Sequence, residues 1–239
     1  MSNIYKKINN FFRNIRYSIY IFFIKKNKTK INLSPLKNNS LTNLMNKYGS
    51  DKGNINNKHN YTKFYESIFS DIKNKKMNFM EVGIGSIDKN ISFHMKFMGN
   101  NYKPLASLYA WQEYFKNSNI YGADIDKNLV KKVDRIKTFY VDMFDEKSII
   151  EMWKKINLKM DVIIDDGFHS YEANINLFKN SFKHLNTSGY YIIEDVHRKP
   201  SNIKKFNNFF IEKKVNFQII DIPHTNNVND NCLIFIKKN

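Results

Sequence analysis

The stretch that most constrains the fold of this chain is residues 161–169, Asp-Val-Ile-Ile-Asp-Asp-Gly-Phe-His. Residues 162–164 form a short run of apolar, β-branched side chains, which is typical of a strand that is buried on both faces of a parallel sheet. The run ends abruptly at Asp165 and Asp166, and His169 follows three residues after Asp166. In open α/β sheets, ligands bind at the carboxyl ends of the strands. We therefore expect a functional site where this strand ends.

A second stretch, residues 189–197, repeats the pattern as Gly-Tyr-Tyr-Ile-Ile-Glu-Asp-Val-His, with an apolar run that ends in Glu194 and Asp195. If the two strands are neighbours, up to four carboxylates and an imidazole converge in one small volume, and repulsion raises the pKa values of the carboxyl groups. A hard divalent cation bound through oxygen ligands removes this repulsion. The pattern thus predicts a metal site. Because only one side of a strand end can face it, the residues alone leave open whether Asp165 or Asp166 is a ligand.

Three further strands are predicted to end at the same edge of the sheet, one in a Gly-x-Gly turn and two in acids. They span residues 78–85, 119–126 and 137–142. Gly83 and Gly85 after the first strand let backbone amides approach a nucleotide-like ligand. An acid after the second strand, such as Asp124, is where folds of this kind hold a ribose diol.

The strands alternate with helices that we predict at residues 105–115, 146–156 and 171–184. The last two strands, 215–222 and 232–237, are joined by an Asn-rich loop and are interpreted most simply as an antiparallel hairpin. This alternation predicts an α/β fold. We expect a doubly wound, mostly parallel, Rossmann-like sheet of seven strands with a closing antiparallel hairpin, preceded by an amino-terminal helical extension.

The 239 residues suffice for one sizeable α/β domain and an appendage, which we divide into residues 1–40 and 41–239. The formal net charge is +17, and residues 1–40 contribute nine Lys or Arg and no acid. Apolar side chains recur at helical spacing in residues 4–24, with basic residues on the other side. Such a basic amphipathic helix would lie on an anionic membrane surface, dock against another subunit of a homo-oligomer, or pack on its own domain. Residues 25–40 are interpreted as a linker.

The cysteine and hydropathy patterns bear on the compartment. The single cysteine, Cys232, excludes an intramolecular disulfide and a Cys-based zinc site, and it fits a reducing cytosol. No stretch approaches the ~18 apolar residues of a membrane-spanning helix. The apolar residues 17–24 follow basic residues but precede no small-residue cleavage site, which disfavours a signal peptide. We expect a cytoplasmic protein that is peripheral, through residues 4–24, to the inner face of the membrane.

A polar turn at residues 47–53, Lys-Tyr-Gly-Ser-Asp-Lys-Gly, follows a predicted helix at 41–48. A second helix is predicted to run to about Phe69. Because the turn lies just before the first strand, we expect it to fold over a ligand as a lid.

Together these residues resemble the class I S-adenosylmethionine-dependent methyltransferases. Within that class the chain resembles the metal-dependent sugar O-methyltransferases that tailor macrolide antibiotics and the related cephalosporin-hydroxylase-like proteins. The segments that carry the resemblance lie within residues 41–200: Lys47-Tyr-Gly-Ser-Asp-Lys, Glu81-Val-Gly-Ile-Gly85, Ser107-Leu-Tyr-Ala-Trp111 with Tyr114-Phe115, Tyr121-Gly-Ala-Asp124-Ile-Asp126, Asp165-Asp-Gly-Phe-His169 and Ile193-Glu-Asp195. Two departures are expected: the family's long amino-terminal substrate-binding domain has no counterpart, and residues 87–104 are longer and more polar than the family pattern.

The resemblance implies a ligand for each group of site residues. S-adenosylmethionine would be held near Glu81, Gly83, Gly85, Asp124, Asp126, Asp142 and Asp165. Mg²⁺ or another divalent cation would be bound by Asp166, Glu194 and Asp195. His169 would be the general base, with Asp166 as its catalytic partner. His59, His94 and His197 are secondary candidates, and Trp111 and Tyr114 are expected in the core of their helix.

These roles fit the chemistry of methyl transfer. The acceptor oxygen attacks in line with the leaving sulfur, so the enzyme must position the reactants and remove a proton from the acceptor. A sugar hydroxyl is too weak an acid for a histidine alone. A divalent cation chelated by adjacent hydroxyls lowers their pKa, and His169 then accepts the proton. The expected function is therefore O-methylation of a sugar or glycan-precursor hydroxyl, for example in polysaccharide biosynthesis.

Two other functions compete with this one. The charge of +17 is compatible with an RNA methyltransferase. Base N-methyltransferases usually carry an Asn/Asp-Pro-Pro-aromatic turn after the fourth strand, and residues 165–169 contain no proline. Nucleic acid is therefore not expected as a partner, although ribose methylation stays open. The third function is a non-catalytic protein that the amphipathic helix recruits to membranes, which the intact set of acids and His169 disfavours.

Overall fold

The computed structural model describes residues 7–9, 11–12, 15, 40–55, 58–88, 90–91, 102–222, 224, 226–227 and 229–239. Most of the predicted amphipathic helix at residues 4–24 lies outside the described residues, and so does His94. No helix among the described residues is long and apolar enough to span a membrane.

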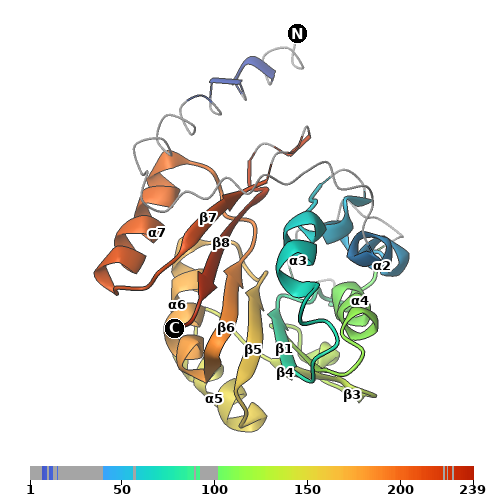
Figure 1. Ribbon diagram of the computed structural model, residues 1–239. Coiled ribbons are helices and arrows are strands. Elements are labelled where there is room, and N and C mark those ends of the chain that lie inside the picture. The colour runs from blue at the N-terminus through green and yellow to red at the C-terminus, as the bar shows by residue number, and fades with distance from the viewer. Residues whose placement is uncertain are drawn as a thin grey trace.

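A single mixed sheet of eight strands runs through the described part of the chain (Figure 1). The strands are β1 (Asn78–Val82), β2 (Asn119–Asp124), β3 (Lys132–Val133), β4 (Ile136–Tyr140), β5 (Met160–Asp165), β6 (Leu185–Ile193), β7 (Gln218–Asp221) and β8 (Cys232–Lys237). They follow the order β3-β4-β2-β1-β5-β6-β8-β7. The five central strands, from β4 to β6, are parallel, and β8 pairs antiparallel with both β6 and β7. The predicted Rossmann-like sheet with an antiparallel end is confirmed.

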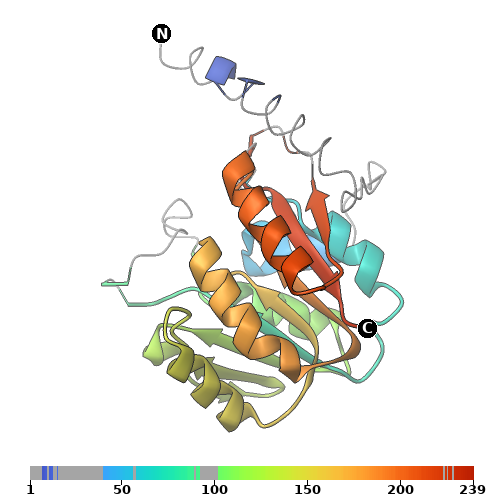
Figure 2. The same cartoon turned by 90° about the vertical axis from the view of Figure 1, so that its left-hand side faces the viewer.

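Helices cover both faces of the sheet (Figures 1 and 2). They are α2 (Ser40–Tyr48), α3 (Thr62–Phe69), α4 (Ala106–Tyr114), α5 (Glu146–Ile156), α6 (Tyr171–Ser181) and α7 (Pro200–Glu212). Side chains of α5, α6 and α7 share one buried apolar cluster, and side chains of α2, α3 and α4 share the other. The sheet therefore separates two cores, and α2, α3 and α4 form one layer against the sheet.

Strand β5 lies at the centre of this arrangement because its apolar residues serve both cores. Ile163 belongs to the cluster with α5–α7, whereas Val162 and Ile164 belong to the other, and all three are fully buried. Burial of each such side chain contributes about 1.5–3 kcal/mol. The strand pairs with β1 on one side and with β6 on the other, where Asp165 lies opposite Ile193. The assumption that the two acid-ended strands are neighbours is therefore confirmed.

Two elements were not predicted. The short strand β3 makes the sheet eight-stranded rather than seven-stranded, and its two exposed residues give little hydrophobic signal. Helix α7 has clearer signals: Pro200 occupies its first turn, and Ile203, Phe206 and Phe210 recur at helical spacing and are buried.

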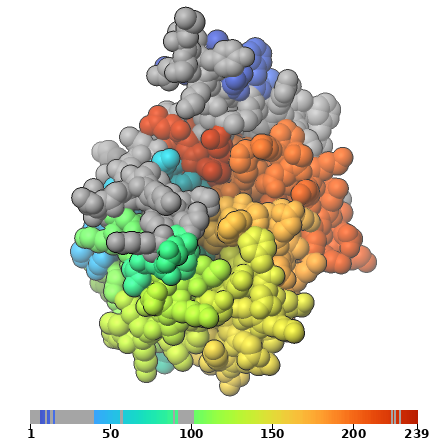
Figure 3. All heavy atoms as spheres, turned by 180° about the vertical axis from the view of Figure 1, so that it is seen from behind, coloured from blue at the N-terminus to red at the C-terminus, as the bar shows by residue number. Residues whose placement is uncertain are grey.

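In the space-filling view from behind, cyan and green residues of the first half of the chain adjoin yellow and orange residues of the second half (Figure 3).

Candidate active site

A cleft opens at the carboxyl edge of the parallel strands, and every one of these strands contributes to its lining. The contributing residues are Gly83 after β1, Asp124 at the end of β2, Asp142 after β4, Asp166 after β5 and Asp195 after β6. The parallel topology is the reason for this convergence, because residues that are far apart in the sequence end at one edge.

The glycine turn after β1 forms one wall of the cleft. Gly83 and Gly85 have φ angles of +91° and +89°, a region that favours glycine. The Asp124 carboxylate accepts a hydrogen bond of 2.8 Å from the backbone N–H of Ile84, so this acid also fixes the turn. A Cβ atom on Gly83 would lie 2.0 Å from the carbonyl oxygen of Asp166. Glycine at this position therefore allows the ends of β1 and β5 to approach each other.

Three acids that we predicted near the cofactor, Glu81, Asp126 and Asp165, are not among the residues that line the cleft. Asp126 is buried and accepts hydrogen bonds of 2.8 Å from Ser86 Oγ and from the backbone N–H of Ile87, so it holds the loop that follows the glycine turn. Asp165 is also buried, and Asn174 Nδ2 donates to it at 3.0 Å. Burial raises the pKa of Asp165 to about 6. Asp126 and Asp165 therefore support the walls of the cleft from outside its lining.

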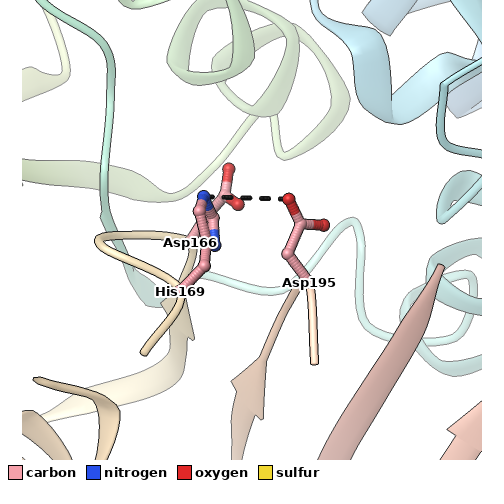
Figure 4. Close-up of side chains that lie close together, drawn as sticks. All are labelled: Asp166, His169 and Asp195. Atoms are coloured by element: carbon pink, nitrogen blue, oxygen red, sulfur yellow. Dashed lines mark ion pairs between the residues drawn. The ribbon is translucent and has the colours of Figure 1, made fainter. Parts of the chain in front are cut away.

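Asp166, His169 and Asp195 form the cluster best placed to hold a metal ion. One ligand atom from each residue lies within 4.8 Å of the others, and the three side chains meet at the strand ends (Figure 4). His169 Nε2 is 3.7 Å from Asp195 Oδ2. Of the two adjacent acids left open by the sequence, Asp166 is the one in this cluster. His169 and Asp195 adopt left-handed backbone angles, with φ of +59° and +52°, and such conformations in residues other than glycine concentrate at functional sites.

A buried lysine lies among the carboxylates of Asp166, Glu194 and Glu81. Lys52 Nζ lies 2.5 Å from Asp166 Oδ2, 2.5 Å from Glu194 Oε2 and 3.4 Å from Glu81 Oε1, and its side chain is 3% exposed. Burial alone would lower the pKa of Lys52, but the three carboxylates outweigh it and hold that pKa well above its usual value. Glu194, a predicted metal ligand, thus pairs with Lys52 and is outside the cluster of Asp166, His169 and Asp195.

Aromatic residues donate hydrogen bonds to the same carboxylates. Tyr61 and Tyr65, one helical turn apart at the start of α3, donate through their hydroxyl groups to Asp195 and Glu194, respectively. The indole N–H of Trp111 donates to Glu81 Oε2 at 2.6 Å. These bonds restrict the orientation of each acid before any ligand arrives, which is a common property of supporting residues around metal sites.

Residues 47–59, which precede β1, also contribute side chains for which the sequence predicts no specific role. The predicted lid at residues 47–53 contributes Gly49 and Lys52 to the cleft, and no motif in the sequence singles out the lysine. His59, a secondary candidate, has its Nδ1 atom 3.4 Å from Asp195 Oδ1. His197 instead accepts a backbone hydrogen bond from Lys199.

Comparisons with known proteins identify relatives of this chain. It is 30% identical over 150 residues to the 8-demethyl-8-alpha-L-rhamnosyl tetracenomycin-C 2'-O-methyltransferase of Streptomyces olivaceus, covering 63% of this chain and 36% of that protein. It is 30% identical over 138 residues to the demethylmacrocin O-methyltransferase of Streptomyces fradiae, covering 58% and 32% of the two chains. This chain is related to the macrolide-sugar O-methyltransferases. The relationship expected from the sequence motifs is thus confirmed.

The chain spans about a third of the length of these curated relatives. Among solved structures it is similar to the MycE methyltransferase from the mycinamycin biosynthetic pathway, in complex with Mg, SAH and mycinamycin VI. The TM-score is 0.61 and the identity 23%, and the match covers 84% of this chain and 55% of MycE. This likeness supports the fold. No family model matches the chain.

Proposed function

We propose that this protein is an O-methyltransferase that uses S-adenosylmethionine and a divalent cation, such as Mg²⁺, to methylate a hydroxyl group of a sugar. The observation that carries the proposal is that Asp166, His169 and Asp195 line the same cleft as the Gly83–Gly85 turn. The relationship of the chain to sugar O-methyltransferases favours this chemistry over others that use the same fold.

The glycine turn and the acids that line the cleft fit S-adenosylmethionine. The cofactor would lie against the turn at Gly83 and Gly85, and Asp124 would accept hydrogen bonds from the ribose hydroxyls. Asp142 lines the cleft after β4 and would contact another part of the same molecule. Asp126, Asp165 and Glu81 would act indirectly, by holding the loop, the strand end and Lys52.

The acidic cluster likewise fits a hard divalent cation. Asp166 and Asp195 supply carboxylate oxygens, which Mg²⁺ prefers, whereas an imidazole is a poorer ligand for it. We therefore assign the cation to the two aspartates and the role of general base to His169. Glu194 becomes a third ligand, as the sequence predicts, if its carboxylate turns away from Lys52.

Each of these residues then has its own role in the reaction. A bound divalent cation lowers the pKa of a hydroxyl group that it contacts. His169 accepts the hydroxyl proton at Nε2, the atom that lies 3.7 Å from Asp195 Oδ2. Tyr61 keeps Asp195 oriented, and the glycine turn would hold the methyl donor beside the acceptor hydroxyl.

A methyl-transfer assay with the full chain tests the proposal. Radiolabelled S-adenosylmethionine, Mg²⁺ and a panel of rhamnosyl and other deoxysugar glycosides should give labelled glycoside. His169→Ala should lower turnover by about 10²–10⁴-fold while S-adenosylhomocysteine and Mn²⁺ still bind, because only the base is removed. Asp166→Asn should lose Mn²⁺ binding as well.

Three results would each refute a different part of the proposal. Full activity in excess chelator would remove the cation from the mechanism and leave the acids as hydrogen-bonding groups. Binding of a nicotinamide nucleotide but not of S-adenosylhomocysteine would end the methyltransferase assignment. Labelling of an RNA transcript, but of no glycoside, would favour ribose methylation instead.

The cellular setting is part of the proposal. We propose a cytoplasmic enzyme of polysaccharide biosynthesis whose residues 4–24 contact an anionic membrane surface or another subunit of a homo-oligomer. Deletion of residues 1–35 removes the predicted amphipathic helix but no strand and none of the helices α2 to α7. The shortened chain should therefore keep its activity on a soluble glycoside and lose sedimentation with anionic vesicles. Loss of activity, together with a smaller oligomer, would assign the segment to a subunit interface.

A further inference from the structure

We propose that Lys52 is an internal cation that competes with the divalent ion for the carboxylates of Asp166 and Glu194, and so limits how tightly the site binds metal. The inference rests on the metal site of the proposed function. Nothing in the sequence motifs assigns this role to the lysine.

The contacts of Lys52 are those of a bound cation. Its ammonium group lies at the same 2.5 Å from one oxygen of Asp166 and one of Glu194, with Glu81 at 3.4 Å. A buried lysine that is surrounded by three carboxylates has exchanged its hydration for ligands, as a metal ion does. The position between Asp166 and Glu194 is therefore already occupied by a positive charge.

This position matters because Asp166 belongs to two groups. It is a member of the triplet with His169 and Asp195, and it is also a partner of Lys52. A divalent ion bound to Asp166 would lie within a few ångströms of the ammonium and would be repelled by it. For Glu194 to join the ligands, its carboxylate must leave the ammonium.

The segment that carries Lys52 is fixed and leaves the side chain little room to withdraw. A Cβ atom on Gly53 would lie 2.5 Å from Asn46 Oδ1 and 2.9 Å from the backbone oxygen of Thr42, so the turn packs directly on α2. Ser50 caps the turn by accepting a hydrogen bond from the backbone N–H of Lys52. The competition is therefore built into the native structure.

Two substitutions at position 52 should change metal affinity in opposite directions. Lys52→Met removes the charge and frees both carboxylates, and it should tighten Mn²⁺ binding by about tenfold or more. Lys52→Arg keeps the charge and offers a guanidinium group, which donates two parallel hydrogen bonds to one carboxylate, and it should weaken Mn²⁺ binding by about the same factor. A lysine that only maintains the shape of the site would give weaker binding in the first variant and little change in the second.

The test is calorimetric titration of the full chain with Mn²⁺ alone, after circular dichroism has verified the fold of each variant. The double variant Lys52→Met/Glu194→Gln removes one charge of each sign and should return the affinity to within about threefold of wild type, because the added ligand is lost again. If Lys52→Met does not fold, Lys52→Arg carries the test, since unchanged or tighter binding in that variant overturns the proposal.

The result also separates this inference from the proposed function. Unchanged or weaker Mn²⁺ binding by Lys52→Met, or tightening that persists in the double variant, overturns the role of Lys52 while wild-type methyl transfer stands. Absence of methyl transfer to any glycoside, with the expected order of Mn²⁺ affinities, overturns the proposed function and leaves the role of Lys52 intact. Absence of Mn²⁺ binding by the wild type overturns both.

Discussion

Replacement of Gly83 by alanine should damage both the fold and the metal site, because this position joins the ends of β1 and β5. The backbone has a φ of +91°, which costs a residue with a Cβ atom about 1–2 kcal/mol. The new Cβ would lie 2.0 Å from the carbonyl oxygen and 2.4 Å from the carbonyl carbon of Asp166. Both atoms are backbone, so relief requires separation of two strand ends, and we place this cost at the upper end of overpacking penalties, about 3 kcal/mol. The sum is about 4–5 kcal/mol.

Gly85→Ala is the matched control. Its φ of +89° carries the same conformational cost, but the Cβ atom would meet the hydroxyl of Tyr102, the end of a side chain that can move. Displacement of that side chain loses its hydrogen bond with the backbone N–H of Ser86, worth about 1 kcal/mol. We therefore expect Gly85→Ala to be more stable than Gly83→Ala by about 2 kcal/mol.

Urea unfolding of both variants, followed by Mn²⁺ titration, measures the two consequences. Only Gly83→Ala should bind Mn²⁺ more weakly than the wild type, because only this substitution displaces Asp166. Equal unfolding free energies and equal Mn²⁺ affinities for the two variants would refute the idea that Gly83 sets the spacing of the strand ends.

Three further predictions concern other described residues. Trp111→Phe should cost about 1–3 kcal/mol of stability, more than Trp153→Phe does. The reason is that the indole of Trp111 donates to the carboxylate of Glu81, whereas the indole of Trp153 donates to a serine hydroxyl. Urea unfolding of the two variants measures the difference. Burial and nearby lysines lower the pKa of His184, so the folded protein binds this proton less well than the unfolded chain does, and stability should fall as the pH drops below about 6.5. His184→Gln should flatten that slope in unfolding midpoints measured between about pH 5 and 7.5, and an unchanged slope would contradict the assignment. Asp124→Ala should weaken S-adenosylhomocysteine binding by about 1–3 kcal/mol in calorimetry, and unchanged affinity would move the ribose partner to another acid.

Much of the fold follows from local patterns in the sequence. The run at residues 162–164 is apolar at every position because both faces of β5 are covered, and this is the signal that identified a parallel sheet. The short strand β3 has no such signal, since its residues are exposed and it is held by pairing with β4 alone. Helix α7 has apolar residues at helical spacing, so its sequence is sufficient to predict it.

The residues of the candidate site also differ in whether the sequence predicts their contacts. Residues that follow the parallel strands, such as Asp166, His169 and Asp195, could be predicted to meet because topology alone brings strand ends together. Lys52 and Tyr65 could not, because their contacts with Glu194 depend on how the α2–α3 layer docks on the sheet. No spacing rule connects residues separated by more than a hundred positions when the contact is made between layers.

The origin of Lys52 in a segment that precedes β1 has a consequence for the order of assembly. The ribosome makes the positive charge first, and the acids that neutralise it emerge later, with Glu194 142 positions after Lys52. Until β6 joins the sheet, Lys52 lacks Glu194 as a partner. If β6 has joined but α2 and α3 have not yet docked, four acids lie close together with no lysine to neutralise them: Glu81, Asp166, Glu194 and Asp195. Their mutual repulsion favours the docking of α2 and α3, and salt in the medium weakens that pull. We expect the last step of folding to be the closure of this layer, and its rate to fall as ionic strength rises.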